Sequence, residues 1–159
     1  MTPPGSPVAK APGRFARLFG RRLRAGSVEV IDDGTLVPLG RAFEVERGDA
    51  AVLDEIAASG RDLARPVLLR HVFRVLGGDR RDDDGLAGEG RDGADVDALL
   101  GGLEVEGYAV ARPDADTLTA SSTVLLTPLS AAQARARMTG LTTRHPVDYL
   151  GWEAFAPSD

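Results

Sequence analysis

Two histidines are the side chains of this chain whose usual pKa best suits acid–base chemistry near neutral pH. Such chemistry needs a carboxylate or a nucleophile within reach of the ring. His71 falls in the alternating segment 67–76, at a position that the alternation assigns to the buried face of a strand. His145 comes directly before Pro146, which favours an extended backbone in a surface loop. We therefore expect a structural role for His71, a surface position for His145, and a catalytic role for neither.

Other reactive groups are equally sparse. The chain contains no cysteine, which excludes a thiolate nucleophile, a disulfide and a cysteine-ligated metal, and two histidines alone do not favour a zinc site. The P-loop and the Gly-x-Ser-x-Gly motif are absent, and the glycines at positions 88, 90 and 93 lie in the charged loop with no strand directly before them, so they carry no weight as a phosphate-binding motif. The run Asp82-Asp83-Asp84-Gly85 lacks the spaced ligands and closing glutamate of a calcium loop, and we interpret it as a solvated charge run. We expect no catalytic, cofactor-binding or metal-binding residues and no enzymatic activity.

Aromatic residues gather around glycines near the end of the chain. The only tryptophan and one of the two tyrosines lie in Tyr149-Leu150-Gly151-Trp152. A glycine flanked by large rings on a strand is typical of a place where two backbones come close while the rings cover the core. Tyr108, directly after Gly107, is the second aromatic candidate. We expect both Tyr108 and Trp152 to pack in the core, with Trp152 mostly buried; ligand stacking or a protein-binding surface that uses Trp152 is the alternative.

Hydrophobic spacing and turn signals predict the elements that position these residues. We expect strands over residues 67–76, 108–111, 117–127 and 149–155, and helices over residues 95–106 and 131–140. Asp95 and Ser130 are the expected N-caps of these helices, and Gly107 is expected to end the first of them in a left-handed conformation. Upstream we expect a short strand over residues 27–31 and a helix over residues 49–59, capped by Asp49 and stopped by Gly60.

The order strand, helix, strand, strand, helix, strand predicts an α+β fold. Two right-handed β-α-β units that share a central hairpin give a ferredoxin-like βαββαβ sandwich, with a four-stranded antiparallel sheet and two helices on one face. This domain is expected over residues 65–156, with a flexible loop over residues 77–93, and it is preceded by an N-terminal extension over residues 27–64. On the first strand of the domain, Arg70 and Arg74 are expected on the open face of the sheet.

Charge divides the chain into a basic tail and an acidic body. Residues 1–26 carry a net charge of +6 with no acidic side chain, and the remainder carries −11. Residues 1–13 are rich in proline, which predicts a disordered leader. Residues 14–26 predict a basic amphipathic helix whose polar side holds five arginines: Arg14, Arg17, Arg21, Arg22 and Arg24. This helix either contacts a membrane or nucleic acid or folds back on its own domain.

Five short motifs follow one another along the chain in a defined order. They are Ser59-Gly60-Arg61-Asp62-Leu63, Arg65-Pro66, His71-Val72-Phe73, Gly107-Tyr108-Ala109-Val110 and Tyr149-Leu150-Gly151-Trp152. In this order and spacing, roughly over residues 50–156, the chain resembles the family of the regulator of ribonuclease E activity B (RraB), the ribonuclease E inhibitor domain. The family usually has Asp at the position of Leu150.

The resemblance implies a bacterial, cytoplasmic, non-enzymatic regulator that binds an endoribonuclease of the E type and modulates RNA cleavage. The residues that carry the family signature and are candidates for interaction are His71, Gly107, Tyr108, Tyr149, Gly151 and Trp152. The alternative function is that of an orphan ferredoxin-like domain, docked to a membrane or to nucleic acid through its basic N-terminal helix. No cofactor is implied by either function.

Overall fold

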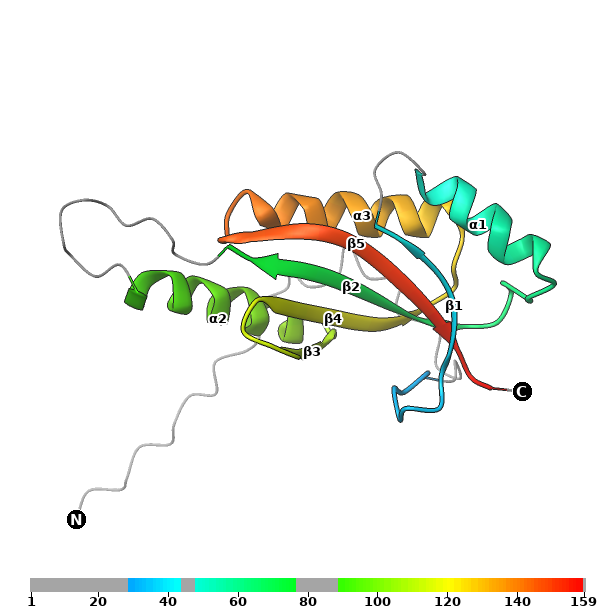
Figure 1. Ribbon diagram of the computed structural model, residues 1–159, viewed down its shortest axis with the longest axis horizontal. Helices are drawn as coiled ribbons and strands as arrows, with labels where there is room; N and C mark the ends of the chain where they lie inside the picture. The colour runs from blue at the N-terminus through cyan, green and yellow to red at the C-terminus, as the bar shows by residue number, and fades with distance from the viewer. Residues whose placement is uncertain (1–28, 44–47, 77–88, 159) are drawn as a thin grey trace, which may run out of the picture.

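The structure is a computed structural model that describes residues 29–43, 48–76 and 89–158 (Figure 1). The predicted leader, the predicted basic helix with its five arginines, and residues 77–88 of the predicted flexible loop lie outside the described residues.

The described chain is a mixed α+β structure built on one open antiparallel sheet. In chain order its elements are β1 (Val37–Ala42), α1 (Gly48–Ala58), β2 (Val67–Val75), α2 (Glu89–Val105), β3 (Ala109–Ala111), β4 (Thr117–Val124), α3 (Pro128–Thr142) and β5 (Val147–Ala156). The five strands have the order β1-β5-β2-β4-β3, and every neighbouring pair is antiparallel.

The fifth strand, β1, corrects the prediction of a four-stranded sheet. Its residues include Pro38 and Gly40, which are unfavourable in strands, so the sequence pattern gave no signal for it. An edge position tolerates proline, because only one side of the strand must pair. The strand predicted over residues 27–31 is wrong for its described part, since residues 29–31 are irregular. There, the Val30 N–H instead donates to the hydroxyl of Thr123 on β4 at 2.9 Å.

Helix α1 agrees with the predicted helix over residues 49–59 to within one residue at each end, and it is followed by Gly60 at a φ of +79°. Helix α2 begins at Glu89, so the predicted loop over 77–93 extends too far and Asp95 is not an N-cap. Two glycines lower the helix propensity of the first turns. The sequence pattern therefore did not predict a helix there. Val96, Leu99 and Leu103 pack in the core and hold the rest of α2 in place. Extending a formed helix by further residues costs little free energy, because helix growth is cooperative.

Helix α3 is longer than the predicted 131–140 and begins one turn earlier. Thr127 is its N-cap, Pro128 stands in the first turn, and Ser130 completes a capping box as the third helical residue rather than acting as the cap. None of the helices in the described ranges has the length and apolar character needed to cross a bilayer.

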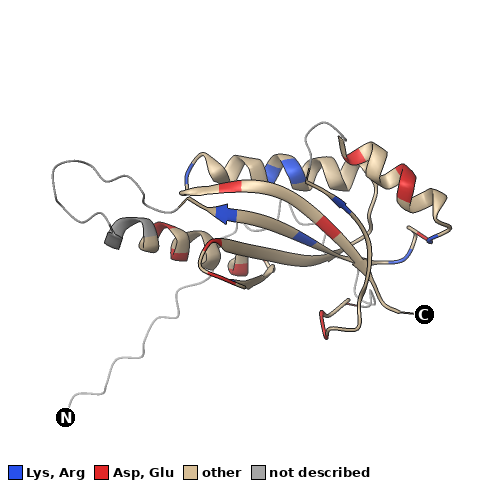
Figure 2. Cartoon of the chain, viewed as in Figure 1, with Lys and Arg blue, Asp and Glu red and all other residues tan. Residues whose placement is uncertain are grey.

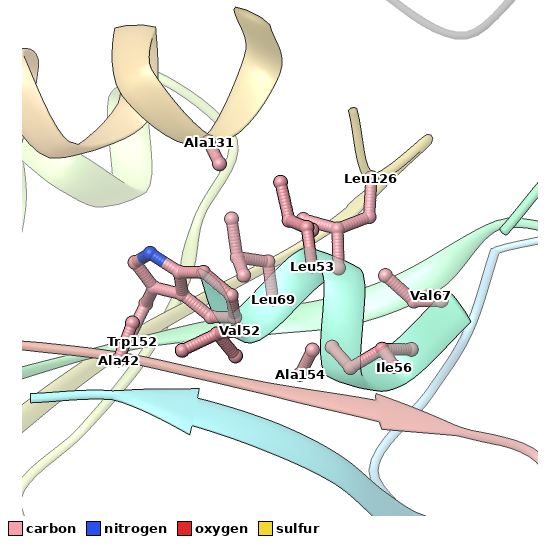
Figure 3. Packing of buried hydrophobic residues seen from close by; sticks show 10 residues of the cluster. All are labelled: Ala42, Val52, Leu53, Ile56, Val67, Leu69, Leu126, Ala131, Trp152 and Ala154. Carbon is pink, nitrogen blue, oxygen red and sulfur yellow. The ribbon is translucent and has the colours of Figure 1, made fainter. Parts of the chain in front are cut away.

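All three helices contribute to the core on one face of the sheet. Alternate residues of β2 enter this core: Val67 and Leu69 belong to one cluster and Phe73 to the other. The first cluster joins α1 and α3 to β1, β2 and β5 (Figure 3): Ala42, Val52, Leu53, Ile56, Val67, Leu69, Leu126, Ala131, Trp152 and Ala154. The second joins α2 and α3 to the other half of the sheet: Phe73, Val96, Leu99, Leu103, Leu118, Ala120, Met138 and Val147. Arg70 and Arg74 lie on the opposite face, as predicted from the alternation.

Candidate functional site

A β-bulge in β5 brings the two rings of the closing motif to the same face of the sheet. Tyr149 and Trp152 are three residues apart, so a regular strand would direct them to opposite faces. Consecutive residues of β2 pair with Tyr149 and Gly151, which leaves Leu150 between them without a partner in the register. The extra residue reverses the alternation. Both rings therefore enter the core beneath the helices, Tyr149 in one cluster and Trp152 in the other.

Gly151 is the place of close backbone approach that the sequence predicts. Its φ is +143°, and a Cβ atom added there would lie 2.2 Å from the carbonyl oxygen of Ala42 and 2.8 Å from the Cα of Phe43. Any side chain at this position would collide with the backbone of Ala42 and Phe43, at the C-terminal end of β1. The missing side chain lets β1 close against β5.

His71 and Tyr149 form a buried hydrogen-bonded pair at the centre of the sheet. The His71 ring is fully buried, and its Nδ1 lies 2.9 Å from the hydroxyl oxygen of Tyr149. Tyr108 packs edge-on against the His71 ring at a centroid distance of 6.1 Å, and Phe73 contacts the Tyr149 ring at 5.3 Å. The predicted structural role of His71 on the core face is thereby explained by the contacts of the ring.

A carboxylate from α1 links this cluster to α3. One oxygen of Asp49 accepts hydrogen bonds from Nε1 of Trp152 at 2.9 Å and from two nitrogens of Arg135 at 2.8 and 2.6 Å. The Arg135 guanidinium also donates to the carbonyl of Ala42 at 2.8 Å and lies 5.8 Å from the centre of the Tyr149 ring. Charge-assisted bonds of this kind are the stronger ones in proteins, and here they join α1, α3, β1 and β5.

Burial sets the protonation states within the cluster. It lowers the pKa of His71 to about 4, with a further lowering from the Arg135 charge and an opposing effect of Asp49. Burial also raises the pKa of Tyr149 and that of Tyr108 above the usual value for a phenol. At neutral pH, His71 is therefore an uncharged imidazole beside a protonated Tyr149.

His71, at the centre of the cluster, is closed to solvent, whereas the side chains of Asp49 and Arg135 are 12% and 26% exposed. A general acid or base must come within hydrogen-bonding distance of its substrate, and both His71 and Trp152 have 0% exposure. Nε2 of His71 has no hydrogen-bond partner among the residues that the structure describes. Such an arrangement stabilises one packing of the core and gives the surrounding surface a fixed shape.

The remaining predicted residues lie outside this centre. Gly107, at a φ of +94°, ends α2 as predicted: its N–H bonds back to Glu104 while the Tyr108 N–H bonds to Leu103, a Schellman motif. His145 lies away from the cluster and hydrogen-bonds the carbonyl of Asp95 through Nδ1.

Sequence reasoning missed the polar half of the cluster. Asp49 was predicted only as a helix cap, and Arg135 was not singled out. A signal for Arg135 did exist, because it stands four residues after Ala131 and three before Met138, both of which are buried. A charged residue in line with the buried stripe of a helix needs a buried partner.

A pocket of about 300 Å³ lies at the end of the sheet, beside the turn that follows α1. Within this turn the Asp62 carboxylate accepts a hydrogen bond from the Ala64 N–H at 2.9 Å. The walls combine the Gly-Arg-Asp motif with apolar residues: Val30, Leu39, Gly60, Arg61, Asp62, Arg65, Pro66, Val67, Ala156 and Pro157. The Gly-Arg-Asp motif thus lines a concave surface separate from the buried cluster.

Comparison of the chain with protein-family models, with curated proteins and with solved structures finds no match in any of the three. Within the described ranges, no three histidine, aspartate or glutamate side chains are grouped so that they could hold a metal ion.

Proposed function

We propose that this chain is a protein-binding regulator of RNA cleavage, acting in the cytoplasm without catalytic chemistry of its own, and that its partner is an endoribonuclease of the E type. The observation that carries the proposal is the convergence of the signature residues. His71, Tyr108, Tyr149 and Trp152 come from three distant parts of the sequence and meet around one buried polar centre. Shared signature residues of a binding domain are expected to do this, since they preserve the scaffold that carries the interaction surface.

The strand order supports the finer part of the proposal, a ferredoxin-like unit. Strands β5, β2, β4 and β3 are neighbours in that order, α2 connects β2 to β3, and α3 connects β4 to β5. This is the order that two interleaved β-α-β units produce. In this proposal β1 is an addition beyond β5.

The surface charge supports a partner with a basic groove. Exposed acidic residues lie along α2 and in the turn between β3 and β4 (Figure 2): Asp95, Asp97, Glu104, Asp114 and Asp116. A channel that binds RNA is basic, so an acidic surface of this kind fits it electrostatically and speeds association at low salt.

The direct test is titration of the purified chain against an endoribonuclease of the E type, with cleavage of a model RNA measured in parallel. We expect a complex and slower cleavage, with association that weakens as salt is raised. In the variant Asp97→Asn/Glu104→Gln, affinity should fall more than in Asp54→Asn/Asp148→Asn, which removes the same charge from α1 and β5. The proposal fails if no complex forms at tens of micromolar, about 6 kcal/mol of binding free energy, and cleavage is unchanged.

The rival function is docking of the domain to a membrane or to nucleic acid through the basic tail. Its supporting observation is the separation of charge, +6 in residues 1–26 and −11 in the rest. Binding of this kind must fall steeply with salt and disappear when residues 1–26 are removed. Binding to the endoribonuclease, by contrast, should survive that truncation.

A further inference from the structure

The side of the sheet opposite the three helices, here called the open face, is covered by no helix within the described ranges. Its outward residues on β2, β3 and β4 are mostly small, hydroxylated or β-branched: Leu68, Arg70, Val72, Arg74, Ala109, Ala111, Thr117, Thr119, Ser121 and Thr123. On β5 the same face carries Asp148, Gly151, Glu153 and Phe155. Val72, Thr119 and Gly151 are register neighbours on β2, β4 and β5 and form the middle of this face.

The N-terminal part of the chain already lies across one end of the open face. Val30 exchanges two hydrogen bonds with the Thr123 side chain, at 2.9 and 3.3 Å, and Asp32 forms an ion pair with Arg70. Val30 and Leu68 are 7% and 4% exposed, although no helix covers them. The 28 residues before position 29 therefore continue from a point fixed on this face.

Those preceding residues contain a segment with an apolar side that needs a surface. In residues 14–24, Phe15, Leu18, Phe19 and Leu23 recur at helical spacing. A helix of 11 residues is marginal alone in water and gains its stability by packing. The tail is also opposite in charge to the body, so electrostatic attraction favours contact within the chain.

The dimensions allow the segment to reach and cover the face. A helix of this length extends about 16 Å. The stretch of β4 from Thr123 to Thr117 is about 20 Å long, and three strand spacings give a width of about 14 Å. Residues 25–29 can span up to roughly 15 Å. From its fixed point at Val30, the segment can therefore lie over Val72 and Thr119.

We propose that residues 14–24 dock as a helix on the open face of their own sheet, with Phe15, Leu18, Phe19 and Leu23 over Val72, Thr119 and the alanines of β3. The sheet then has helices on both faces. The docked tail is not available to bind phosphates or lipid headgroups. This inference does not depend on the identity of the protein partner.

The test uses the natural absence of cysteine. A spin label attached to Arg17→Cys in the full chain should broaden the amide signals of Val72, Ala111 and Thr119 beyond detection and leave those of α1 and α3 visible. The signals should return when Phe15→Asp/Leu18→Asp is added, because the apolar side is then lost. Lys10→Ala, outside the segment, is the matched control and should change nothing.

Three outcomes would overturn the proposal. One is the absence of broadening on the open face, and another is broadening that persists in the Phe15→Asp/Leu18→Asp variant. The third comes from mixing spin-labelled chain with unlabelled, isotope-enriched chain. Broadening of the same signals in that mixture, where the observed chain carries no spin label, would assign the open face to a second copy. Emission of Trp152 in each variant verifies that the core is folded.

Discussion

At the scale of single residues, Leu150 and Gly151 determine which side chains of β5 face the core and how closely β1 packs against it. The bulge at Leu150 turns Tyr149 and Trp152 to one face, and Gly151 permits β1 to approach within a distance that no side chain would allow. Among the residues that the structure describes, the carboxylate bonded to the Trp152 indole is that of Asp49, on α1.

Replacing Gly151 should be costly even with the smallest side chain. Gly151→Ala places a Cβ in a left-handed conformation and against the Ala42 carbonyl, so we expect a loss of about 2–4 kcal/mol in the free energy of unfolding. Gly140→Ala is the matched control, because Gly140 lies in α3 with open space around it; stability should stay equal or rise by up to about 1 kcal/mol. Urea unfolding followed by Trp152 emission measures both, and equal effects would contradict this account of β5.

The buried His71 should make stability depend on pH. Its pKa is about 4 in the folded chain and about 6.5 when unfolded, so the unfolded state binds the proton first as pH falls. Stability is full above pH 6.5 and decreases as pH falls toward 4, by about 3 kcal/mol in total and about 2 kcal/mol between pH 7 and 5.

His71→Leu should remove this contribution to the slope, whatever its effect on absolute stability. His145→Gln should retain the contribution of His71, because it leaves the buried ring and its contact with Tyr149 unchanged. Urea unfolding at a series of pH values checks both. An unchanged slope in His71→Leu would mean that His71 is not buried as an uncharged ring.

At the scale of elements, α3 holds the two halves of the core together. Ala131 packs in one cluster and Met138 in the other, and Arg135 between them bonds to Asp49 on α1. Its first turn is fixed by the reciprocal bonds of Thr127 and Ser130. The helix is otherwise weakly amphipathic, so its position depends on these few contacts.

The capping box of α3 gives a prediction at this scale. Thr127→Ala removes the oxygen that accepts from the Ser130 N–H, and we expect a loss of about 1 kcal/mol. Thr139→Ala, at an exposed position within the same helix, should be neutral or slightly stabilising since alanine has the higher helix propensity. Thermal unfolding monitored by circular dichroism compares the two. A larger loss for Thr139→Ala would contradict the assigned cap.

At the scale of the whole molecule, the folded unit extends upstream of residue 50, where the span of the proposed family likeness begins. Strand β1 and Asp49 both precede residue 50, yet β1 pairs with β5 and Asp49 bonds to Trp152. Residues 50–156 alone are therefore shorter than the unit that buries this core.

Two fragments test this extent. Residues 29–158 should fold with Trp152 emission like that of the full chain. In the fragment 50–158, the Trp152 indole N–H and Arg135 lose the Asp49 carboxylate, and β5 loses its neighbour β1. Trp152 emission should therefore shift to the red, and the melting temperature should fall. The Asp49–Arg135 pair is partly exposed, so its loss alone should cost less than the about 3–5 kcal/mol of a fully buried pair, still a notable share of the stability of a small domain. Equal melting temperatures would show that β1 is dispensable.

The sequence by itself determined the features that depend on local pattern. Alternation over residues 67–76 placed His71 inside and Arg70 and Arg74 outside, because side-chain direction in a strand has a period of two. Glycine placed the ends of α1 and α2, since Gly60 and Gly107 adopt positive φ without strain. The burial of Trp152 and the close approach at Gly151 also followed from residue type.

Only the tertiary structure decided the rest, because the interactions concerned are non-local. The bonds of Asp49 to Arg135 and Trp152 join residues 86 and 103 positions apart, and no local pattern specifies such pairs. Strand β1 forms, despite its proline and glycine, because it pairs with the free edge of β5. The bulge at Leu150 is a property of the register between two strands. It is therefore visible only when both strands are in place.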